Sequence, residues 1–236
     1  MLYQEIAKYY DLIYHWKDYK KDAYKLKKLI SKFKKSDGNE LLDVACGTGH
    51  HLNYLKNNFN CIGVDINKKM LKVAKNNVKD VVFKQANMIN FNLNKKFDVV
   101  LCLFSSIGYV KTYQNLRRTI NNFSKHLKKN GIVIIEPWFV KSKFKAGMPG
   151  MTTYDSKYLK IARLNTSKVK NNISILDMHY LIGEKNKEIK HFVDRHEIGL
   201  FEMDKTLQFM KQSGLQARFL KNGLMKDRGI YLGTRI

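Results

Sequence analysis

Short apolar runs alternate with segments of helical periodicity along the first part of the chain. Apolar strands are predicted at residues 41–44, 61–64, 81–83, 97–104 and 132–135. Between them, apolar side chains recur every three or four positions over 50–57, 68–77 and 113–129, the last helix ending at Gly131. Repeated strand–helix units favour a parallel sheet with right-handed crossovers. We therefore expect an α/β fold with a Rossmann-like sheet and helices on both faces.

The pattern changes between residues 140 and 202. Segments 161–164, 173–182 and 189–201 alternate partly and are rich in β-forming residues, with turns predicted at 170–172 and 183–187. We predict a small inserted antiparallel sheet that forms a lid or substrate lobe over 140–202. The main domain then comprises 1–139 and 203–236, ending with a helix near 204–213 and strands at 215–220 and 229–234.

Three histidines, His179, His191 and His196, lie in the predicted insertion. Their spacing is not that of a metal motif, so we expect surface or hydrogen-bonded histidines and no metal site. At the other end of the chain, the first 35 residues are rich in tyrosine and are predicted as two helices joined near 15–19. These tyrosines can pack on the sheet, cap a polar ligand, or do both; we favour the cap.

The stretch 41–50 joins an apolar strand to a helix through a turn with two glycines, Gly47 and Gly49. Glycine allows the backbone to approach a ligand closely, and the free N–H groups of the helix start face it. The next strand ends at Asp65, and an acid at this place binds ribose hydroxyls in doubly wound folds. The dinucleotide fingerprint needs a small residue where Leu52 stands, which disfavours NAD and FAD. A glycine turn without a cofactor is the alternative.

The net charge of +24 suggests nucleic acid, but the type of basic residue argues against it. Of the 44 basic residues 37 are Lys and 7 are Arg, and Asn is abundant at 21, which indicates a compositional bias of the genome. Nucleic-acid sites favour the guanidinium fork of Arg, and the lysines are scattered over predicted helix faces. The charge can still attract an anionic small molecule. No apolar run reaches the length of a membrane span and the N-terminus has no signal-peptide pattern, so we expect a cytoplasmic protein without membrane contact.

The pattern Asp-x-x-x-Gly-x-Gly, followed by a strand that ends in an acid, resembles motif I of the class I S-adenosylmethionine (SAM) methyltransferases. The chain as a whole resembles the sugar N-methyltransferases that dimethylate TDP-amino sugars. The segments that carry this resemblance are Tyr10-Asp11-Leu12, Lys17-Asp18-Tyr19, 42–49, 104–109, Glu136-Pro137-Trp138, Met178-His179-Tyr180 and Arg228-Gly229. Departures are Asn87 for the usual acid, Asp65 where Glu is frequent, and the absence of small residues over 224–227.

The resemblance implies N-methylation of a nucleotide-linked amino sugar, with SAM as cofactor, in a homodimer. It implies a cofactor site made of Tyr10, Ala45, Cys46, Gly47, Gly49, Asp65, Ile66, Asn87, Met88 and Leu103. Tyr109 and Tyr3 are the catalytic candidates and would orient the acceptor amine, since an unperturbed phenol is a poor base near neutral pH. The candidates for the sugar and its diphosphate are Tyr19, Trp138, Arg163, His179 and Arg228.

Three alternative functions stay open at this point. A SAM-dependent N-methyltransferase of a small free amine such as glycine needs no basic diphosphate site. An RNA methyltransferase predicts RNA affinity that falls steeply with salt. The third alternative is a SAM-binding regulatory subunit without catalytic activity.

Overall fold

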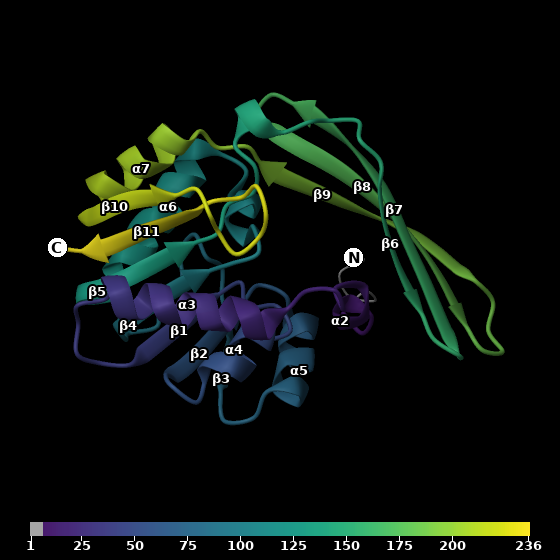
Figure 1. The fold of residues 1–236 in the computed structure, drawn as a ribbon, viewed down its shortest axis with the longest axis horizontal. Helices are drawn as coiled ribbons and strands as arrows, with labels where there is room; N and C mark the ends of the chain where they lie inside the picture. Colours follow the sequence, from purple (N-terminus) through teal and green to yellow (C-terminus); the bar gives the residue numbers. More distant parts are fainter. Residues whose placement is uncertain (1–6) are drawn as a thin grey trace.

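A seven-stranded sheet with the order β10-β11-β5-β4-β1-β2-β3 forms the centre of the computed structural model, which describes residues 7–236 (Figure 1). Strands β1 to β5 pair in parallel, and β11 runs antiparallel to its two neighbours, β5 and β10. The predicted Rossmann-like sheet is therefore confirmed. The strands are β1 (Glu40–Val44), β2 (Asn60–Asp65), β3 (Val82–Gln85), β4 (Phe97–Cys102), β5 (Leu127–Ile135), β10 (Leu215–Leu220) and β11 (Ile230–Arg235).

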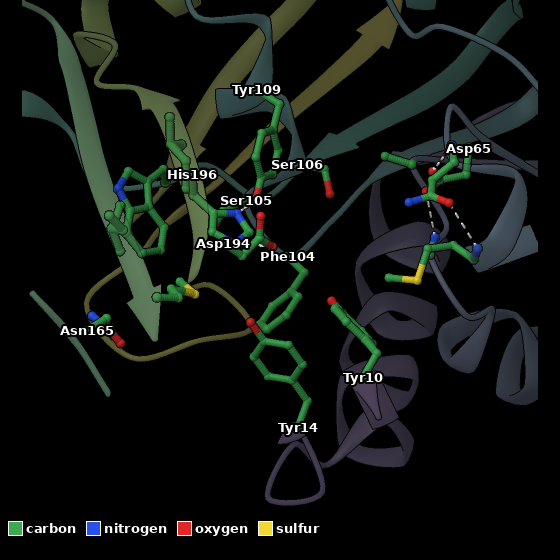
Figure 2. Close-up of a pocket in the computed structure, with 18 of the residues that line it drawn as sticks. Tyr10, Tyr14, Asp65, Phe104, Ser105, Ser106, Tyr109, Asn165, Asp194 and His196 are labelled. Carbon is green, nitrogen blue, oxygen red and sulfur yellow. Dashed lines mark hydrogen bonds and ion pairs between the residues drawn. The ribbon is translucent and has the colours of Figure 1, made fainter. Parts of the chain in front are cut away.

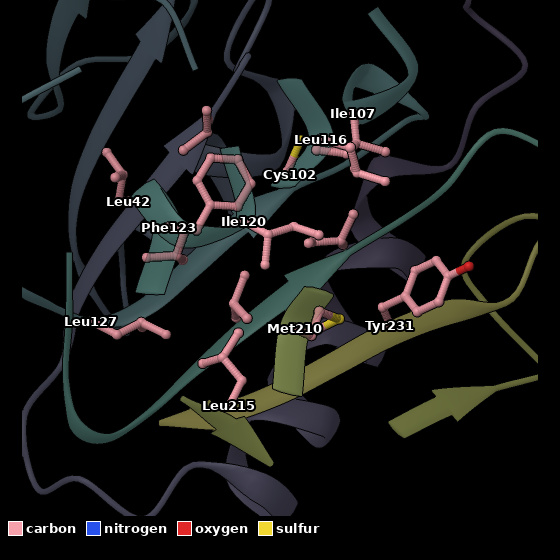
Figure 3. Close-up of a cluster of buried hydrophobic side chains, with 14 of the residues drawn as sticks. Leu42, Cys102, Ile107, Leu116, Ile120, Phe123, Leu127, Met210, Leu215 and Tyr231 are labelled. Atoms are coloured by element: carbon pink, nitrogen blue, oxygen red, sulfur yellow. The ribbon is translucent and has the colours of Figure 1, made fainter. Parts of the chain in front are cut away.

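Helices cover both faces of this sheet, as expected. One apolar cluster joins it to α3 (Tyr19–Phe33), α4 (His50–Leu55) and α5 (Lys68–Asn77). The other, which includes Phe123, joins it to α6 (Tyr113–Lys125) and α7 (Met203–Gln212) (Figure 3). No helix among the described residues is long and apolar enough to cross a bilayer.

The helix predicted over 113–129 is shorter than expected. It ends at Lys125, and β5 already begins at Leu127, which pairs with Phe97 of β4. Asn130 adopts a left-handed conformation at φ +65°, so the strand is irregular before it resumes pairing at Ile132. Leu127 is fully buried and belongs to β5. Gly131 lies inside this strand and does not end the helix.

The insertion between β5 and α7 forms a separate four-stranded antiparallel sheet of long, twisted strands (Figure 1). Its strands are β6 (Gly150–Asp155), β7 (Leu159–Lys170), β8 (Ile173–Glu184) and β9 (Lys190–Gly199), and two single 3₁₀ turns, η1 (Ser106–Val110) and η2 (Lys141–Lys143), precede it. The predicted antiparallel sheet is confirmed. Strand β6 was not predicted from the sequence. Its side chains alternate between exposed and partly buried, and it follows a segment that contains glycine and proline.

The short helix α2 (Tyr10–Ile13) connects the two sheets. Tyr9 and Ile13 pack into the apolar cluster on the inner face of the inserted sheet. The hydroxyl of Tyr9 also donates to Glu184 Oε1 at 2.5 Å, at the end of β8. The two helices predicted within the first 35 residues are α2 and α3, and α2 stands between the lobes.

We expect Phe123→Ala to lower the free energy of unfolding by about 3–5 kcal/mol, because it removes a fully buried ring and leaves a cavity. The matched control is Tyr24→Ala, since Tyr24 is an exposed aromatic residue on α3 and should change stability by no more than about 0.5 kcal/mol. Urea denaturation of both variants measures the difference. Equal effects of the two substitutions would contradict this assignment of the core.

Candidate active site

One cavity of about 420 Å³ lies where the carboxyl edge of the main sheet, α2 and the inner face of the inserted sheet meet (Figure 2). The carboxyl ends of parallel strands share one edge, so the loops after β1, β2, β4 and β5 all reach this space. The turn after β1 contributes Ala45 and Gly47, β2 contributes Asp65, and the loop after β4 contributes Phe104 to Tyr109. A second, smaller cavity of about 40 Å³ adjoins it beneath the glycine turn.

The Asp65 carboxylate fixes the glycine turn through hydrogen bonds to the backbone. The backbone N–H of Gly47 donates to Asp65 Oδ2 at 2.9 Å, and that of Asn67 donates to Oδ1 at 2.8 Å. Gly47 has φ +56°, and a Cβ there would meet no atom within 4 Å, so its backbone faces free space. Burial raises the pKa of Asp65, although these two N–H groups favour the carboxylate. The turn therefore offers a fixed acid beside exposed backbone.

Asp43, beneath the same turn, is buried and has no cationic partner among residues 7–236. It is 2% exposed, and it lines the smaller cavity. Burial, followed by the negative charge of Asp65, raises the pKa of Asp43 to about 8. At neutral pH this carboxyl is therefore mostly protonated.

Asp11 ties α2 to the glycine turn and to α5. Its carboxylate accepts from Thr48 Oγ1 at 2.6 Å and from Asn77 Nδ2 at 2.9 Å, and His50 Nε2 lies 3.0 Å from it. Burial alone would raise the pKa of Asp11, but the bonds from His50 and Thr48 outweigh it and lower this pKa. These contacts hold the neighbouring Tyr10 over the two cavities.

The loop after β4 is bent by two successive residues with positive φ, Phe104 at +50° and Ser105 at +66°. Such a backbone is costly for residues other than glycine and needs support. The fully buried Glu136 accepts from the Phe104 N–H at 2.7 Å, and Ser105 Oγ donates to the Pro137 carbonyl at 3.0 Å. The bend directs Ser106 and Tyr109 into the cavity. The segments Phe-Ser-Ser-Ile-Gly-Tyr and Glu-Pro-Trp therefore hold each other in place.

Gly108, in the 3₁₀ turn η1, permits β9 to approach this loop. A Cβ on Gly108 would collide with the side chain of Ile198. The close approach brings His196 of β9 next to Tyr109, and His196 Nδ1 lies 2.6 Å from the Tyr109 hydroxyl. His196 Nε2 lies 3.0 Å from Asp194 Oδ2. Tyr109, His196 and Asp194 all line the cavity (Figure 2).

Two guanidinium groups complete the wall. Arg228 lies over Trp138, with its guanidinium carbon 4.3 Å from a ring centroid, and donates to Ser105 Oγ at 2.7 Å. Burial lowers the pKa of Arg228, although the charge of Glu136 opposes this. Arg163 donates to Thr152 at 2.8 Å, but its Nε and NH1 atoms are buried without a hydrogen-bond partner among the described residues. Buried donors left unsatisfied in this way suit an anion with several acceptor oxygens.

Most of the residues proposed from the sequence meet at these two cavities. The main cavity is lined by Tyr10, Ala45, Gly47, Asp65, Ile66, Met88, Tyr109, Trp138, Arg163 and Arg228. Tyr19, Cys46 and Leu103 line the smaller one, which places Tyr19 by the glycine turn and away from the two arginines. Tyr3 lies outside the described residues.

Three proposed residues line neither cavity. Gly49 has φ +81° and precedes α4, so its role is in the turn itself. Asn87 Oδ1, the oxygen expected to meet an adenine amine, accepts a hydrogen bond from the Ile89 N–H at 3.0 Å and keeps a second lone pair. His179 is exposed on the outer face of the inserted sheet, stacked on His191, because β8 alternates and places Met178 and Tyr180 inward.

Several lining residues, chiefly those of the inserted sheet, were not predicted from the sequence. They include Asn165, Met178, Tyr180, Asp194 and His196, which share the inner face through strand alternation and cross-strand pairing. The alternation was visible in the sequence, but nothing in it indicated which phase faces inward. His196 is hydrogen-bonded, as expected of these histidines.

The comparisons with known proteins agree with this geometry. The family described as "Methyltransferase domain" matches residues 35–196. The dTDP-3-amino-3,4,6-trideoxy-alpha-D-glucopyranose N,N-dimethyltransferase of Streptomyces venezuelae is 31% identical over 97% of this chain and 97% of its own. The crystal structure of Streptomyces venezuelae DesVI superposes with a TM-score of 0.91 at 31% identity, covering 98% of each chain.

A solved structure with cofactor is also similar. It is that of SAM-bound CalS10, an amino pentose methyltransferase from Micromonospora echinaspora, with a TM-score of 0.84 at 25% identity. It covers 93% of this chain and 92% of its own. The likeness extends through the inserted sheet as well as the main one.

Asp43→Asn should gain stability relative to the unsubstituted protein as the pH rises from about 5 to about 8, and the difference should level off above that. Folding raises the pKa of Asp43 above the value of about 3.9 of a free aspartate, so the folded state binds more protons than the unfolded state in this window and stability falls with pH. Asparagine does not titrate and removes this loss.

Urea denaturation of both proteins at several pH values measures the effect on Asp43. The matched control is Asp37→Asn at an exposed turn, for which we expect a difference independent of pH. A stability difference for Asp43→Asn that stays constant across the same window would contradict a buried, protonated carboxyl.

Proposed function

Because this chain belongs to the family of the TDP-amino-sugar N,N-dimethyltransferases, within the class I SAM-dependent methyltransferases, we propose that it methylates the amino group of a TDP-linked amino sugar. One observation carries the proposal: a single cavity joins the acid-ended strand at Asp65 to two partly buried arginines, Arg163 and Arg228. The acid at Asp65 suits a nucleoside with a free ribose, and the two arginines suit a diphosphate.

The residues around the glycine turn fit SAM. The open backbone at Gly47 and the fixed carboxylate of Asp65 suit its amino-acid end and its ribose, and Ile66 and Met88 offer apolar contacts for adenine. SAM supplies a methyl group on a sulfonium whose thioether is a good leaving group. The protein then has to position the amine and exclude water. Tyr10 and α2, fixed through Asp11, cover the site from the side of solvent.

The far side of the cavity fits the nucleotide sugar. Arg228, which lies over Trp138, and Arg163, with two unsatisfied buried nitrogens, can together bind the oxygens of a diphosphate. A small amine such as glycine has one carboxylate and would leave one of these groups unpaired. An RNA substrate fits less well, because the cavity is enclosed by α2 and the inserted sheet and the chain is poor in Arg.

The homodimer and the cytoplasmic location stay predictions. In support of a dimer, the outer face of the inserted sheet carries exposed apolar side chains, Met151, Leu164 and Leu181. Cross-strand pairing sets Met151 beside Leu164, and Leu164 beside His179, in one row of this face. A second copy would bury this face.

Asp65→Ala should abolish the binding of S-adenosylhomocysteine, because it removes the carboxylate that holds the glycine turn and faces the ribose. Tyr109→Phe should keep that affinity and lower turnover, since Tyr109 lies at the other part of the cavity (Figure 2). Titration calorimetry measures the affinity, with Asp37→Ala as the control for loss of an exposed acid. Equal affinity of Asp65→Ala and the unsubstituted protein would overturn the cofactor site.

Arg163→Met should weaken TDP binding by about 10- to 100-fold, because a charged hydrogen bond contributes about 1.5–3 kcal/mol. Affinity for S-adenosylhomocysteine should not change. The control is Arg218→Met, which removes an exposed guanidinium stacked on Phe33 outside the cavity. The measurement is calorimetric titration with TDP in the presence of S-adenosylhomocysteine. Cofactor binding without any TDP binding would instead favour a small free amine, and tight, salt-sensitive RNA binding would favour RNA.

A further inference from the structure

Tyr109, His196 and Asp194 form a connected row of titratable groups at the cavity wall. The Tyr109 hydroxyl lies 2.6 Å from His196 Nδ1, and His196 Nε2 lies 3.0 Å from Asp194 Oδ2. His196 and Asp194 are each 6% exposed, whereas Tyr109 is 38% exposed. None of these contacts is needed to close the inserted sheet, whose strands are already paired throughout.

Two of the described neighbours of His196, Tyr109 and Asp194, favour one of its tautomers. The contact between Asp194 Oδ2 and His196 Nε2 is an ion-pair contact at 3.0 Å and not an aligned hydrogen bond. The negative charge of a carboxylate at this distance still favours a proton on Nε2. Nδ1 is then left with its lone pair facing the Tyr109 hydroxyl, which donates to it. The arrangement is that of a base whose acceptor atom faces the substrate through one hydroxyl, with a carboxylate behind it to stabilise the imidazolium.

We propose that His196, held by Asp194, is the acceptor of the proton that the substrate amine loses, with Tyr109 as the relay. This inference rests on the proposed function and adds to it the path of the proton. An amine that enters as an ammonium ion must become neutral before its lone pair can attack a methyl group. A phenol alone is a poor base near neutral pH, whereas an imidazole titrates in this range.

The step balances as a double proton transfer. One N–H bond of the ammonium breaks and its proton passes to the Tyr109 oxygen, while the Tyr109 hydroxyl proton passes to His196 Nδ1. Tyr109 ends neutral, His196 ends as an imidazolium beside the Asp194 carboxylate, and the amine ends neutral. Its lone pair then forms the N–C bond to the methyl carbon as the C–S bond breaks and its electrons pass to sulfur. His196 returns its proton to solvent, which readies the site for a second methylation.

The fold explains why the base comes from the inserted sheet. Tyr109 belongs to the loop after β4, and His196 and Asp194 belong to β9, which the absence of a side chain at Gly108 allows to come close. Apart from Tyr109 and Asp194, the charged and titratable groups of the described residues that line the cavity are Tyr10, Tyr14, Asp65, Arg163, Tyr180 and Arg228. The strand next to β9 presents apolar Leu176 and Met178 to the cavity beside His196 and Asp194.

The test compares the pH dependence of kcat/KM for His196→Asn with that of the unsubstituted enzyme, using SAM and a TDP-amino sugar. Asparagine keeps an acceptor for Tyr109 but cannot take a proton. We expect a loss on the order of 100-fold at pH 7, typical of a removed general base. The loss should shrink steadily at higher pH, where the amine arrives already neutral. Asp194→Asn should show the same dependence on pH with a smaller loss, and neither variant should change the affinity for S-adenosylhomocysteine.

The matched control is His191→Asn, since His191 lies on the outer face of the same strand. We expect this substitution to leave the pH dependence of kcat/KM unchanged. A loss for His196→Asn that is equal at every pH would overturn the proposal and leave a structural role. Nitrogen NMR of the unsubstituted protein gives a second reading: a proton on Nε2 supports the relay, and a proton on Nδ1 overturns it. If the unsubstituted enzyme methylates no amino sugar at all, the proposed function fails before this inference is reached.

Discussion

The candidate active site depends on one buried carboxylate, that of Glu136. It is fully buried, and its two oxygens accept from the backbone N–H groups of Phe104, after β4, and Met225, in the loop before β11. The first bond supports two consecutive residues with positive φ, which side chains other than glycine rarely tolerate without compensation. The second holds the loop that carries Arg228. One side chain therefore fixes both the bend that presents Tyr109 and the guanidinium on Trp138.

The two sheets contribute different chemistry to the same cavity. The main sheet supplies the glycine turn and Asp65 at its carboxyl edge, as doubly wound folds do. The inserted sheet supplies Arg163, Asp194 and His196 from its inner face. Helix α2 links them, bonded through Asp11 to the turn and packed through Ile13 on the inserted sheet. The cavity is bounded by all of these parts, so the proposed function assigns the insertion a direct role in binding.

The sequence predicted the elements better than the side chains that face the cavity. The helix over Lys68–Asn77, with Asn67 as its N-cap, and the strand Leu215–Leu220 lie where the pattern placed them, because each has strong local signals. Helix α6 ended early because Leu127 pairs with Phe97, a contact that local periodicity does not reveal. In the insertion, His179 was predicted as a substrate-binding residue and His196 was not. Both lie on strands that alternate between two faces. Which face points toward the cavity is set by α2 and the main sheet, which are distant in sequence.

The most direct test of the account is mass spectrometry of the products formed with SAM from a mixture of a TDP-amino sugar and free glycine. The account predicts that the nucleotide sugar gains the mass of one methyl group and then of a second, while glycine is unchanged. Such a result would support a nucleotide-linked amino sugar as the acceptor. Methylation of glycine with the nucleotide sugar unchanged would contradict the claim that this cavity is built for a sugar nucleotide.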